Sequence, residues 1–142
     1  MGTVNITHDW TFDLETGYDR RAEGGDVVLW KPGRTVYASV FDTDGAEADD
    51  ALAKLLADRP GTPKQTFDRV EPGLAGHAYL LPEGEGPGRY WGLNTWTAAK
   101  GSVACVTFYF DDLDDLPWAL AAWRSVRRVA AGPGADGMAL PN

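Results

Sequence analysis

Cysteine, histidine and long apolar runs are scarce in this sequence, and each scarcity excludes a class of protein. Cys105 is the only cysteine among 142 residues, so neither an intramolecular disulfide nor a cysteine-rich metal site can form. No stretch approaches the roughly eighteen apolar residues that a membrane-spanning helix needs. Residues 1–5 lack the basic and apolar regions of a secretory signal peptide. We therefore expect a cytoplasmic protein that does not span a membrane.

An excess of basic residues is also missing. The chain has 13 lysines and arginines against 21 aspartates and glutamates, which gives a formal net charge of -8. Nucleic acids and anionic membranes repel such a chain, so we expect neither as a partner. The apolar and charged fractions, 44% and 24%, are ordinary for a globular protein. We predict a single domain over residues 1–130 and a flexible, glycine-rich tail over residues 131–142.

Alternating and β-branched residues predict most of the strands. Residues 4–14 alternate in polarity, which predicts one half-buried strand or two short strands broken near His8-Asp9. Pro32-Gly33 supplies the fixed and then positive φ angles of a hairpin turn, and a longer hairpin is predicted to turn at Lys100-Gly101. The other predicted strands cover residues 26–30, 35–41, 66–70, 76–81, 89–98 and 102–110. The segments predicted as loops are residues 15–21 and 83–88.

Two amphipathic segments are predicted to be helices. In the first, Asp44 and Glu47 have the spacing of a capping box, and apolar residues then recur at helical spacing until Pro60-Gly61. The second is predicted to begin near Asp115 and to carry Arg127-Arg128 in its last turns, where cations suit the helix dipole.

The order of these elements predicts the fold class. Strands, a helix, more strands and a final helix, joined by short connections, are typical of an α+β domain. We predict an antiparallel sheet of about six to seven strands flanked by the two helices. Residues 27–30 and 103–110 are largely apolar on both faces of their strands. A strand of that kind is covered on both faces, so we expect an α/β/α sandwich.

The N-terminal and C-terminal segments resemble a known fold family. Residues 10–18, Trp-Thr-Phe-Asp-Leu-Glu-Thr-Gly-Tyr, are similar to the opening of PsbP/Mog-like proteins, although Glu15 replaces the usual proline. The final segment, with its Ser125-Val126 pair, also resembles that family, and the likeness spans residues 4–129. The family includes photosystem subunits, a Ran-binding protein and adaptor chaperones of type VI secretion effectors. The resemblance implies binding of another protein rather than catalysis, and it assigns no site residues.

One acidic motif suggests an alternative activity. Asp42-Thr43-Asp44-Gly45 follows a predicted strand and resembles the first motif of haloacid-dehalogenase-type phosphatases. That resemblance implies a nucleophilic Asp42 and an acid/base Asp44 that together hold Mg²⁺. Asp111-Asp112 and Lys100 would supply the other groups. Such enzymes need a parallel sheet, whereas hairpins are predicted here. We therefore predict a non-enzymatic protein without cofactors and keep a small Mg-dependent hydrolase that uses Asp42 and Asp44 as the alternative.

The remaining titratable groups have structural explanations. The acidic run Asp111–Asp115 lacks the spacing of a calcium loop and suits the start of a helix. Cys105 and His77 both lie in predicted strands, where a free cysteine behaves as a small apolar residue. His8 is predicted to be half-buried, and two histidines so far apart indicate no metal site.

Aromatic residues are the feature present in surplus. The chain has six tryptophans, five tyrosines and five phenylalanines, which serve equally well in a core or at an interface. We predict a non-catalytic protein-binding module, an adaptor, chaperone or immunity-type factor, which contacts another protein or peptide through an aromatic patch on its sheet. Self-association as a homodimer is left open. The candidate patch residues are Trp30, Tyr37, Tyr90, Trp91, Trp96 and Tyr109.

Overall fold

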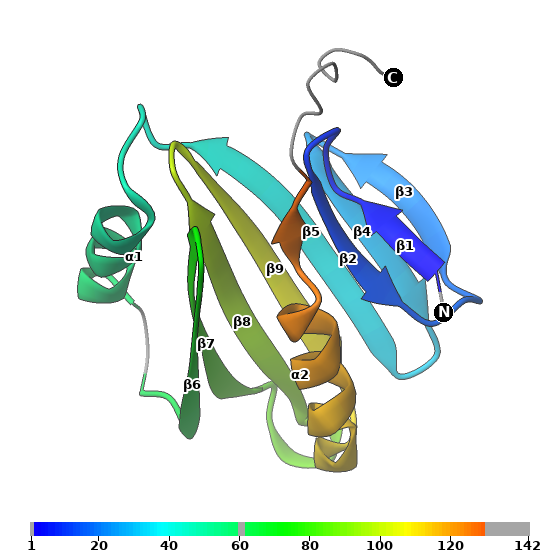
Figure 1. The fold of residues 1–142 in the computed structure, drawn as a ribbon. Coiled ribbons are helices and arrows are strands. Elements are labelled where there is room, and N and C mark those ends of the chain that lie inside the picture. Colours follow the sequence, from blue (N-terminus) through cyan, green and yellow to red (C-terminus); the bar gives the residue numbers. More distant parts are fainter. Residues whose placement is uncertain (1, 60–61, 130–142) are drawn as a thin grey trace.

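The structure, a computed structural model, describes residues 2–59 and 62–129. Within these residues the strands form a seven-stranded sheet of order β3-β4-β5-β9-β8-β7-β6 and a three-stranded sheet of order β1-β2-β10 (Figure 1). Every strand pair is antiparallel. The strands are β1 (Gly2–Asn5), β2 (Trp10–Leu14), β3 (Asp19–Glu23), β4 (Asp26–Lys31), β5 (Arg34–Asp42), β6 (Gln65–Glu71), β7 (Leu74–Glu83), β8 (Tyr90–Ala99), β9 (Ser102–Phe110) and β10 (Arg127–Arg128). The helices are α1 (Ala48–Ala57) and α2 (Leu116–Arg124), with short 3-10 turns at Gly86–Gly88 and Leu113–Asp115.

The predicted α+β class and antiparallel sheet are confirmed. The predicted hairpins form as expected, because Gly33 and Gly101 adopt φ angles of 80° and 78° in the two tight turns. Residues 4–14 form two paired strands rather than one, with the break at the predicted place. The α/β/α layering and the PsbP/Mog-like family stay predictions, and the predicted tail over residues 131–142 lies outside the described residues.

Three predictions about local structure are wrong. The segment 15–21, predicted as a loop, runs into edge strand β3, whose side chains are all exposed and therefore show no polarity alternation. The predicted capping box does not form, because α1 begins after Glu47 without a side-chain cap, and Asp44 adopts a φ of 53° in the preceding turn. Arg127-Arg128 does not extend α2 but forms β10, which pairs with β2.

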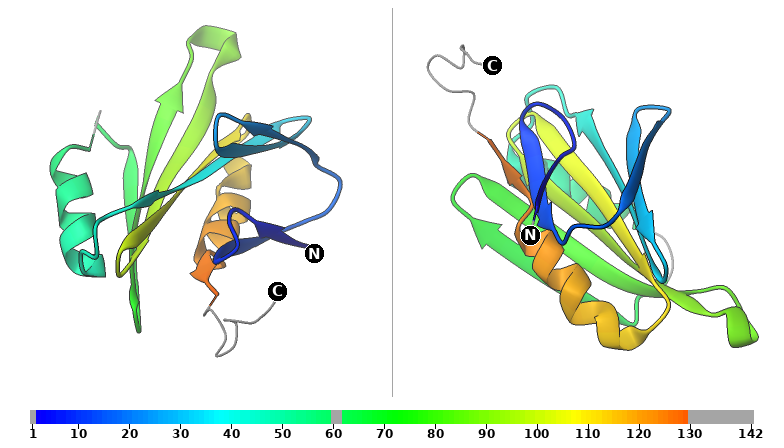
Figure 2. Two further views of the ribbon diagram at one scale, coloured as in Figure 1. Left: turned by 90° about the horizontal axis from the view of Figure 1, so that it is seen from above. Right: turned by 90° about the vertical axis from the view of Figure 1, so that its right-hand side faces the viewer.

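One face of the large sheet carries the main core. Helix α2 and strand β2 lie against this face, as Figures 1 and 2 show from three directions. Two tryptophans that are completely buried here also satisfy their indole nitrogens: Trp123 donates to Thr97 Oγ1 at 3.2 Å, and Trp10 donates to Ser102 Oγ at 2.9 Å. The buried core residues of the strands include Phe12, Leu14, Leu29, Val36, Leu80, Leu93, Val106, Phe108 and Phe110.

The opposite face is covered at one end. Ala51 of α1 packs on Ala98 and Val103 in a second, smaller core, with Trp96 at its border. The helix contacts β7, β8 and β9. Among the described residues, nothing covers the part of this face formed by β4, β5 and the neighbouring halves of β8 and β9. No described helix is long and apolar enough to cross a bilayer.

Candidate functional site

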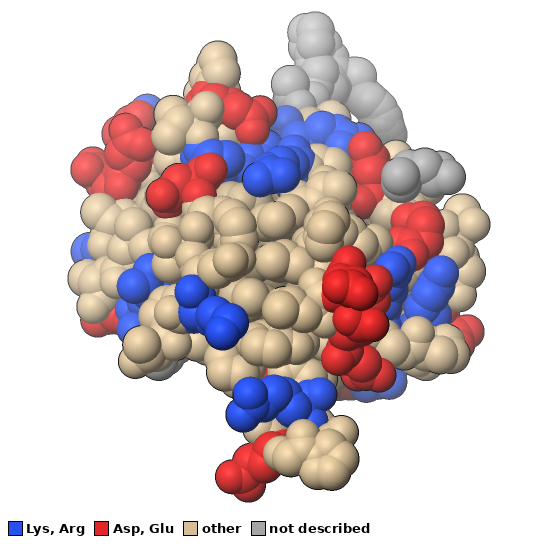
Figure 3. All heavy atoms as spheres, turned by 90° about the horizontal axis from the view of Figure 1, so that it is seen from below, with Lys and Arg blue, Asp and Glu red and all other residues tan. Residues whose placement is uncertain are grey.

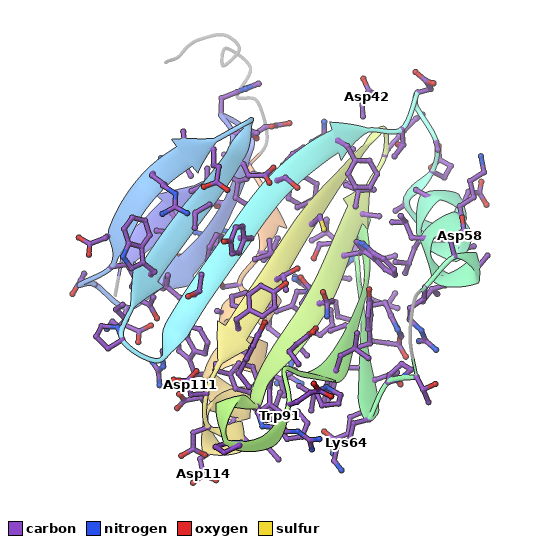
Figure 4. All side chains as sticks on the ribbon, turned by 180° about the vertical axis from the view of Figure 1, so that it is seen from behind. Asp42, Asp58, Lys64, Trp91, Asp111 and Asp114 are labelled. Carbon is purple, nitrogen blue, oxygen red and sulfur yellow. The ribbon has the colours of Figure 1, made fainter. Side chains whose placement is uncertain are left out.

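The uncovered part of the large sheet is called the open face below. It consists of the side chains that alternate outward from β4, β5, β9 and the start of β8, on the side that faces the viewer in Figure 4. These side chains are Val28, Trp30, Thr35, Tyr37, Tyr90, Asn94, Thr107 and Tyr109.

Four predicted patch residues come together on the open face. The ring centroids of Tyr37 and Tyr109 lie 5.9 Å apart at an interplanar angle of 86°. Tyr90 meets Tyr109 from the other side, with centroids 5.9 Å apart and an angle of 68°. Trp30 lies on β4 beneath the guanidinium of Arg21, which is 4.9 Å from the indole centroid. These ring contacts link the three tyrosines across β5, β9 and β8. Trp30 lies on the same face of β4, with Thr35 between it and Tyr109 in the register.

Two shallow hollows lie along this aromatic set. One, of about 480 Å³, is lined by Tyr37, Tyr90, Tyr109 and Asp111. The second, of about 570 Å³, is lined by Trp30, Asp19 and Arg21. Both hollows are bordered by Thr35 and Tyr37, so together they form one groove across β3, β4, β5 and β9. Its lining combines aromatic rings with polar groups, and its rim carries charges of both signs.

Two predicted patch residues lie elsewhere. Trp96 points to the same side as the open face but packs against α1, where it borders the second core. Trp91 pairs with Phe110 in the register and packs against the main core on the opposite face. A one-residue step along a strand reverses the direction of its side chain, so Tyr90 and Trp91 cannot share a face. The patch is therefore Trp30, Tyr37, Tyr90 and Tyr109.

The sequence did not indicate the charged and small residues of the groove. Asp111 and Arg21 reach it from a strand end and from the edge strand β3. Gly92 lies under the Tyr109 ring, since a Cβ atom at Gly92 would stand 3.1 Å from Tyr109 Cε1. The pairing of Gly92 with Tyr109 follows from the register of β8 with β9, and the sequence alone does not show this register.

Cys105 and His77 do not form a nucleophile–base pair. They lie two strands apart on one face, with Trp96 between them, a separation of about 10 Å between backbones. His77 instead lies 2.7 Å from Asp68 Oδ1 through Nδ1, and 2.9 Å from Arg59 Nη1 through Nε2. Burial, and then the charge of Asp26, raise the pKa of the Cys105 thiol, which disfavours the reactive thiolate.

The acidic residues of the hydrolase alternative lie at opposite ends of the sheet. Asp42 ends β5 opposite Ser102, whereas Asp111 follows Phe110, which pairs with Arg34 at the start of β5. The nine residues of β5 separate the two strand ends by about 25 Å along the backbone. Figure 4 shows the labels of Asp42 and Asp111 at opposite ends of the sheet. Asp42 Oδ1 accepts a hydrogen bond from the Asp44 backbone N–H at 2.7 Å. No cluster of metal-ligating side chains occurs within residues 2–59 and 62–129.

The acidic run before α2 has structural partners. Arg34 donates to Asp115 Oδ1 at 2.9 Å and to Glu15, and its guanidinium lies 4.5 Å from the Trp118 ring centroid. The hydrogen bond to Asp115 is the main cause that raises the pKa of Arg34. Asp112 Oδ1 accepts from the Asp114 backbone N–H at 2.9 Å, as an N-cap does. This cluster fixes α2 and β2 to the large sheet.

No protein-family model and no curated protein matches the chain. Among solved structures, it is similar to a crystal structure of a protein from Bacteroides thetaiotaomicron VPI-5482, with a TM-score of 0.69 and 12% sequence identity. The match covers 88% of this chain and 47% of that chain, so this chain spans about half the length of the similar protein. At this identity the likeness shows the fold alone.

Proposed function

We propose that the protein is a non-catalytic binding module that holds another protein or peptide against its open face. The observation that carries the proposal is the gathering of Trp30, Tyr37, Tyr90 and Tyr109 along one groove. An adaptor, chaperone or immunity-type role and membership of the PsbP/Mog-like family are part of the same proposal.

The exposure of these aromatic side chains supports binding rather than packing. The structure contains a separate core on the other side of the sheet, in which Trp10 and Trp123 are completely buried. Tyr90 is 37% exposed, and Trp30, Tyr37 and Tyr109 are half-buried. Tyrosine and tryptophan are the residues most enriched among those that dominate protein interfaces, because they bury a large area at little cost in side-chain entropy.

The shape of the open face supports an elongated ligand. The groove crosses several strands, its floor is aromatic, and charged residues such as Asp19, Arg21 and Asp111 stand at its rim. A hydrophobic centre with a polar rim is the usual anatomy of a protein interface. A partner segment that lies in the groove would bury the aromatic rings while its polar groups meet the rim.

Capture with matched variants tests this proposal. The purified protein captures a partner from the cell extract, and the affinity of the isolated pair is then measured for Trp30→Leu, Tyr37→Leu and the control Leu56→Ala. Leu56 is also an exposed apolar residue, at 36%, but lies on α1. We expect about 30-fold weaker binding for the first two variants and an unchanged affinity for the control, since residues central to an interface contribute about 2 kcal/mol each.

The same experiment defines its contradiction. Wild-type affinity in both folded groove variants would exclude the open face as the contact. A captured partner that proves to be a second copy of this chain, sensitive to the same variants, would identify the module as a homodimer.

A further inference from the structure

One end of the groove is a pocket walled by three tyrosines. This tyrosine pocket is the hollow of about 480 Å³ and is lined by Gly33, Arg34, Thr35, Tyr37, Tyr90, Tyr109 and Asp111. Both outer rings meet the central Tyr109 edge-to-face, at 86° and 68°, so the rings stand as walls at different angles rather than as a flat stack. Such an arrangement presents several ring faces and edges to one shallow hollow.

Unpaired carboxylates surround the tyrosine pocket. Asp111 lines the pocket. The Glu83 carboxylate lies beside the central ring, because a Cβ atom added at Gly92 would meet Tyr109 Cε1 at 3.1 Å and Glu83 Oε2 at 3.4 Å. Within the described part of the chain, neither Asp111 nor Glu83 belongs to an ion pair. Figure 3 shows both acidic and basic side chains at the end of the molecule where Asp111 is labelled in Figure 4.

The cation that lines the tyrosine pocket is already neutralised. Arg34 is bound by Glu15 and Asp115 and stacks on Trp118, which belongs to the opposite side of the sheet. The exposed Arg89 precedes Tyr90 but is not one of the residues that line the hollow. Burial, and then the charge of Glu83, raise the pKa of Tyr109, which keeps the phenol neutral and is consistent with a negative potential at this ring.

The chemistry of these groups selects the charge of the ligand. The face of an aromatic ring carries negative electron density and attracts a cation within about 6 Å. The two carboxylates add to this attraction, and they would repel an anionic ligand. We propose that the tyrosine pocket binds the cationic side chain of an arginine or lysine that belongs to the partner protein. The proposal rests on the proposed function, and a basic segment also suits a chain whose formal net charge is -8.

A comparison of a charged probe with its neutral isostere tests the proposal. N-acetyl-arginine methylamide and N-acetyl-citrulline methylamide have nearly the same shape, but only the first carries a charge. Each is titrated into the protein while the backbone amide signals of Gly92 and Tyr109 are followed by NMR. We expect saturable shifts with the arginine probe and about two- to fivefold weaker binding of the citrulline probe, the ratio expected for one exposed cation–π contact.

Two charge variants separate a local site from general attraction. Asp111→Asn removes a carboxylate that lines the pocket, and Asp44→Asn removes an exposed one at the far end of β5, where asparagine tolerates the φ of 53°. We expect the arginine probe to bind about threefold more weakly to Asp111→Asn, as for the loss of one exposed charge pair, and equally well to Asp44→Asn. Tyr109→Phe keeps the ring and should retain binding, whereas Tyr109→Leu should lose it.

Several results would overturn the inference. The first is equal affinity for the two probes, and the second is equal weakening of the arginine probe by Asp111→Asn and Asp44→Asn. The third is no shift of the Gly92 and Tyr109 amide signals at about 50 mM arginine probe, where even a very weak site is occupied. The proposed function fails separately. If Trp30→Leu and Tyr37→Leu abolish partner capture while the two probes bind alike, the open face is the contact but its pocket does not select a cation. If the arginine probe selects the pocket while those variants leave capture intact, the binding proposal alone fails.

Discussion

Arg69 is expected to be the most sensitive polar residue of the fold, and Arg69→Met measures its contribution. The side chain lies inside the molecule, on the face of β6 that meets the end of α2. Its Nη1 donates to the backbone carbonyl oxygens of Trp123 at 2.8 Å and Val126 at 2.9 Å. Its Nη2 lies 2.6 Å from Glu71 Oε2. The substitution keeps an apolar stem of similar length but removes all of these hydrogen bonds.

The magnitude follows from the groups left behind. The carbonyl of Trp123 keeps the hydrogen bond from the Val126 backbone N–H at 3.0 Å, so its loss is small. The carbonyl of Val126 loses its donor, which costs about 1–3 kcal/mol, and a charged donor lies at the upper part of this range. The bridge to Glu71 adds at most about 1 kcal/mol, because that carboxylate is half exposed to solvent. We therefore expect Arg69→Met to lower the free energy of unfolding by about 3 kcal/mol and the melting temperature by roughly 10 °C. Arg69→Lys keeps a charged donor but loses the planar fork that reaches Glu71 and the carbonyls together, and it should lose about half as much.

Urea unfolding followed by tryptophan fluorescence provides the assay. Trp123 lies within the affected contact, so its emission reports both local and global unfolding. A loss below about 1 kcal/mol for Arg69→Met would show that the Val126 carbonyl finds another donor. Equal losses for the methionine and lysine variants would show that a charged donor at this position contributes little. The reasoning about buried hydrogen bonds at the end of α2 would then be wrong.

Three further predictions concern single groups. Gly76→Ala should destabilise the fold, because an added Cβ would stand 2.8 Å from Arg69 Cγ. Thermal unfolding measures the loss, which should be smaller when Gly76→Ala is introduced into the Arg69→Ala variant than into the wild type. Although burial opposes ionisation of Glu15, the hydrogen bond from Trp118 Nε1 lowers its pKa. Its stabilisation is therefore present above the ordinary value of 4.5 and is lost as the pH falls below it, so acid unfolding should be flatter for Glu15→Gln. Burial raises the pKa of the Cys105 thiol, so Cys105 should need a higher pH than an exposed cysteine to react with iodoacetamide.

The pattern of apolar residues predicted most strands of the large sheet. Alternation and tight turns determine which segments pair as hairpins, and these contacts are local in sequence. The edge strand β3 was missed because Asp19, Arg20 and Arg21 carry no apolar alternation, and its stability comes from pairing with β4. Strand β10 was missed because Arg127 and Arg128 directly follow α2 and were predicted as its last turns. Their extended conformation comes from pairing with β2, which is distant in the sequence.

The candidate site was predictable in part. Composition predicted an aromatic patch, and four of its six residues, Trp30, Tyr37, Tyr90 and Tyr109, lie on β4, β5, β8 and β9, whose registers place them on one face. The sequence could not show which tryptophans face inward, because the covering elements α1 and α2 come from distant segments. It also could not show the carboxylates beside the tyrosines, since they reach the pocket across strand ends.

The alkylation rate of Cys105 tests the central claim most directly. Its thiol lies on the same side of the sheet as the groove, between Ser39 and Trp96 in the register, and no other cysteine competes for the reagent. Mass spectrometry follows alkylation at alkaline pH with and without a saturating partner. If the partner lies on the open face, we predict at least a severalfold slower reaction in the complex than in the free protein. An unchanged rate in a fully formed complex would show that the partner binds elsewhere and would contradict this account.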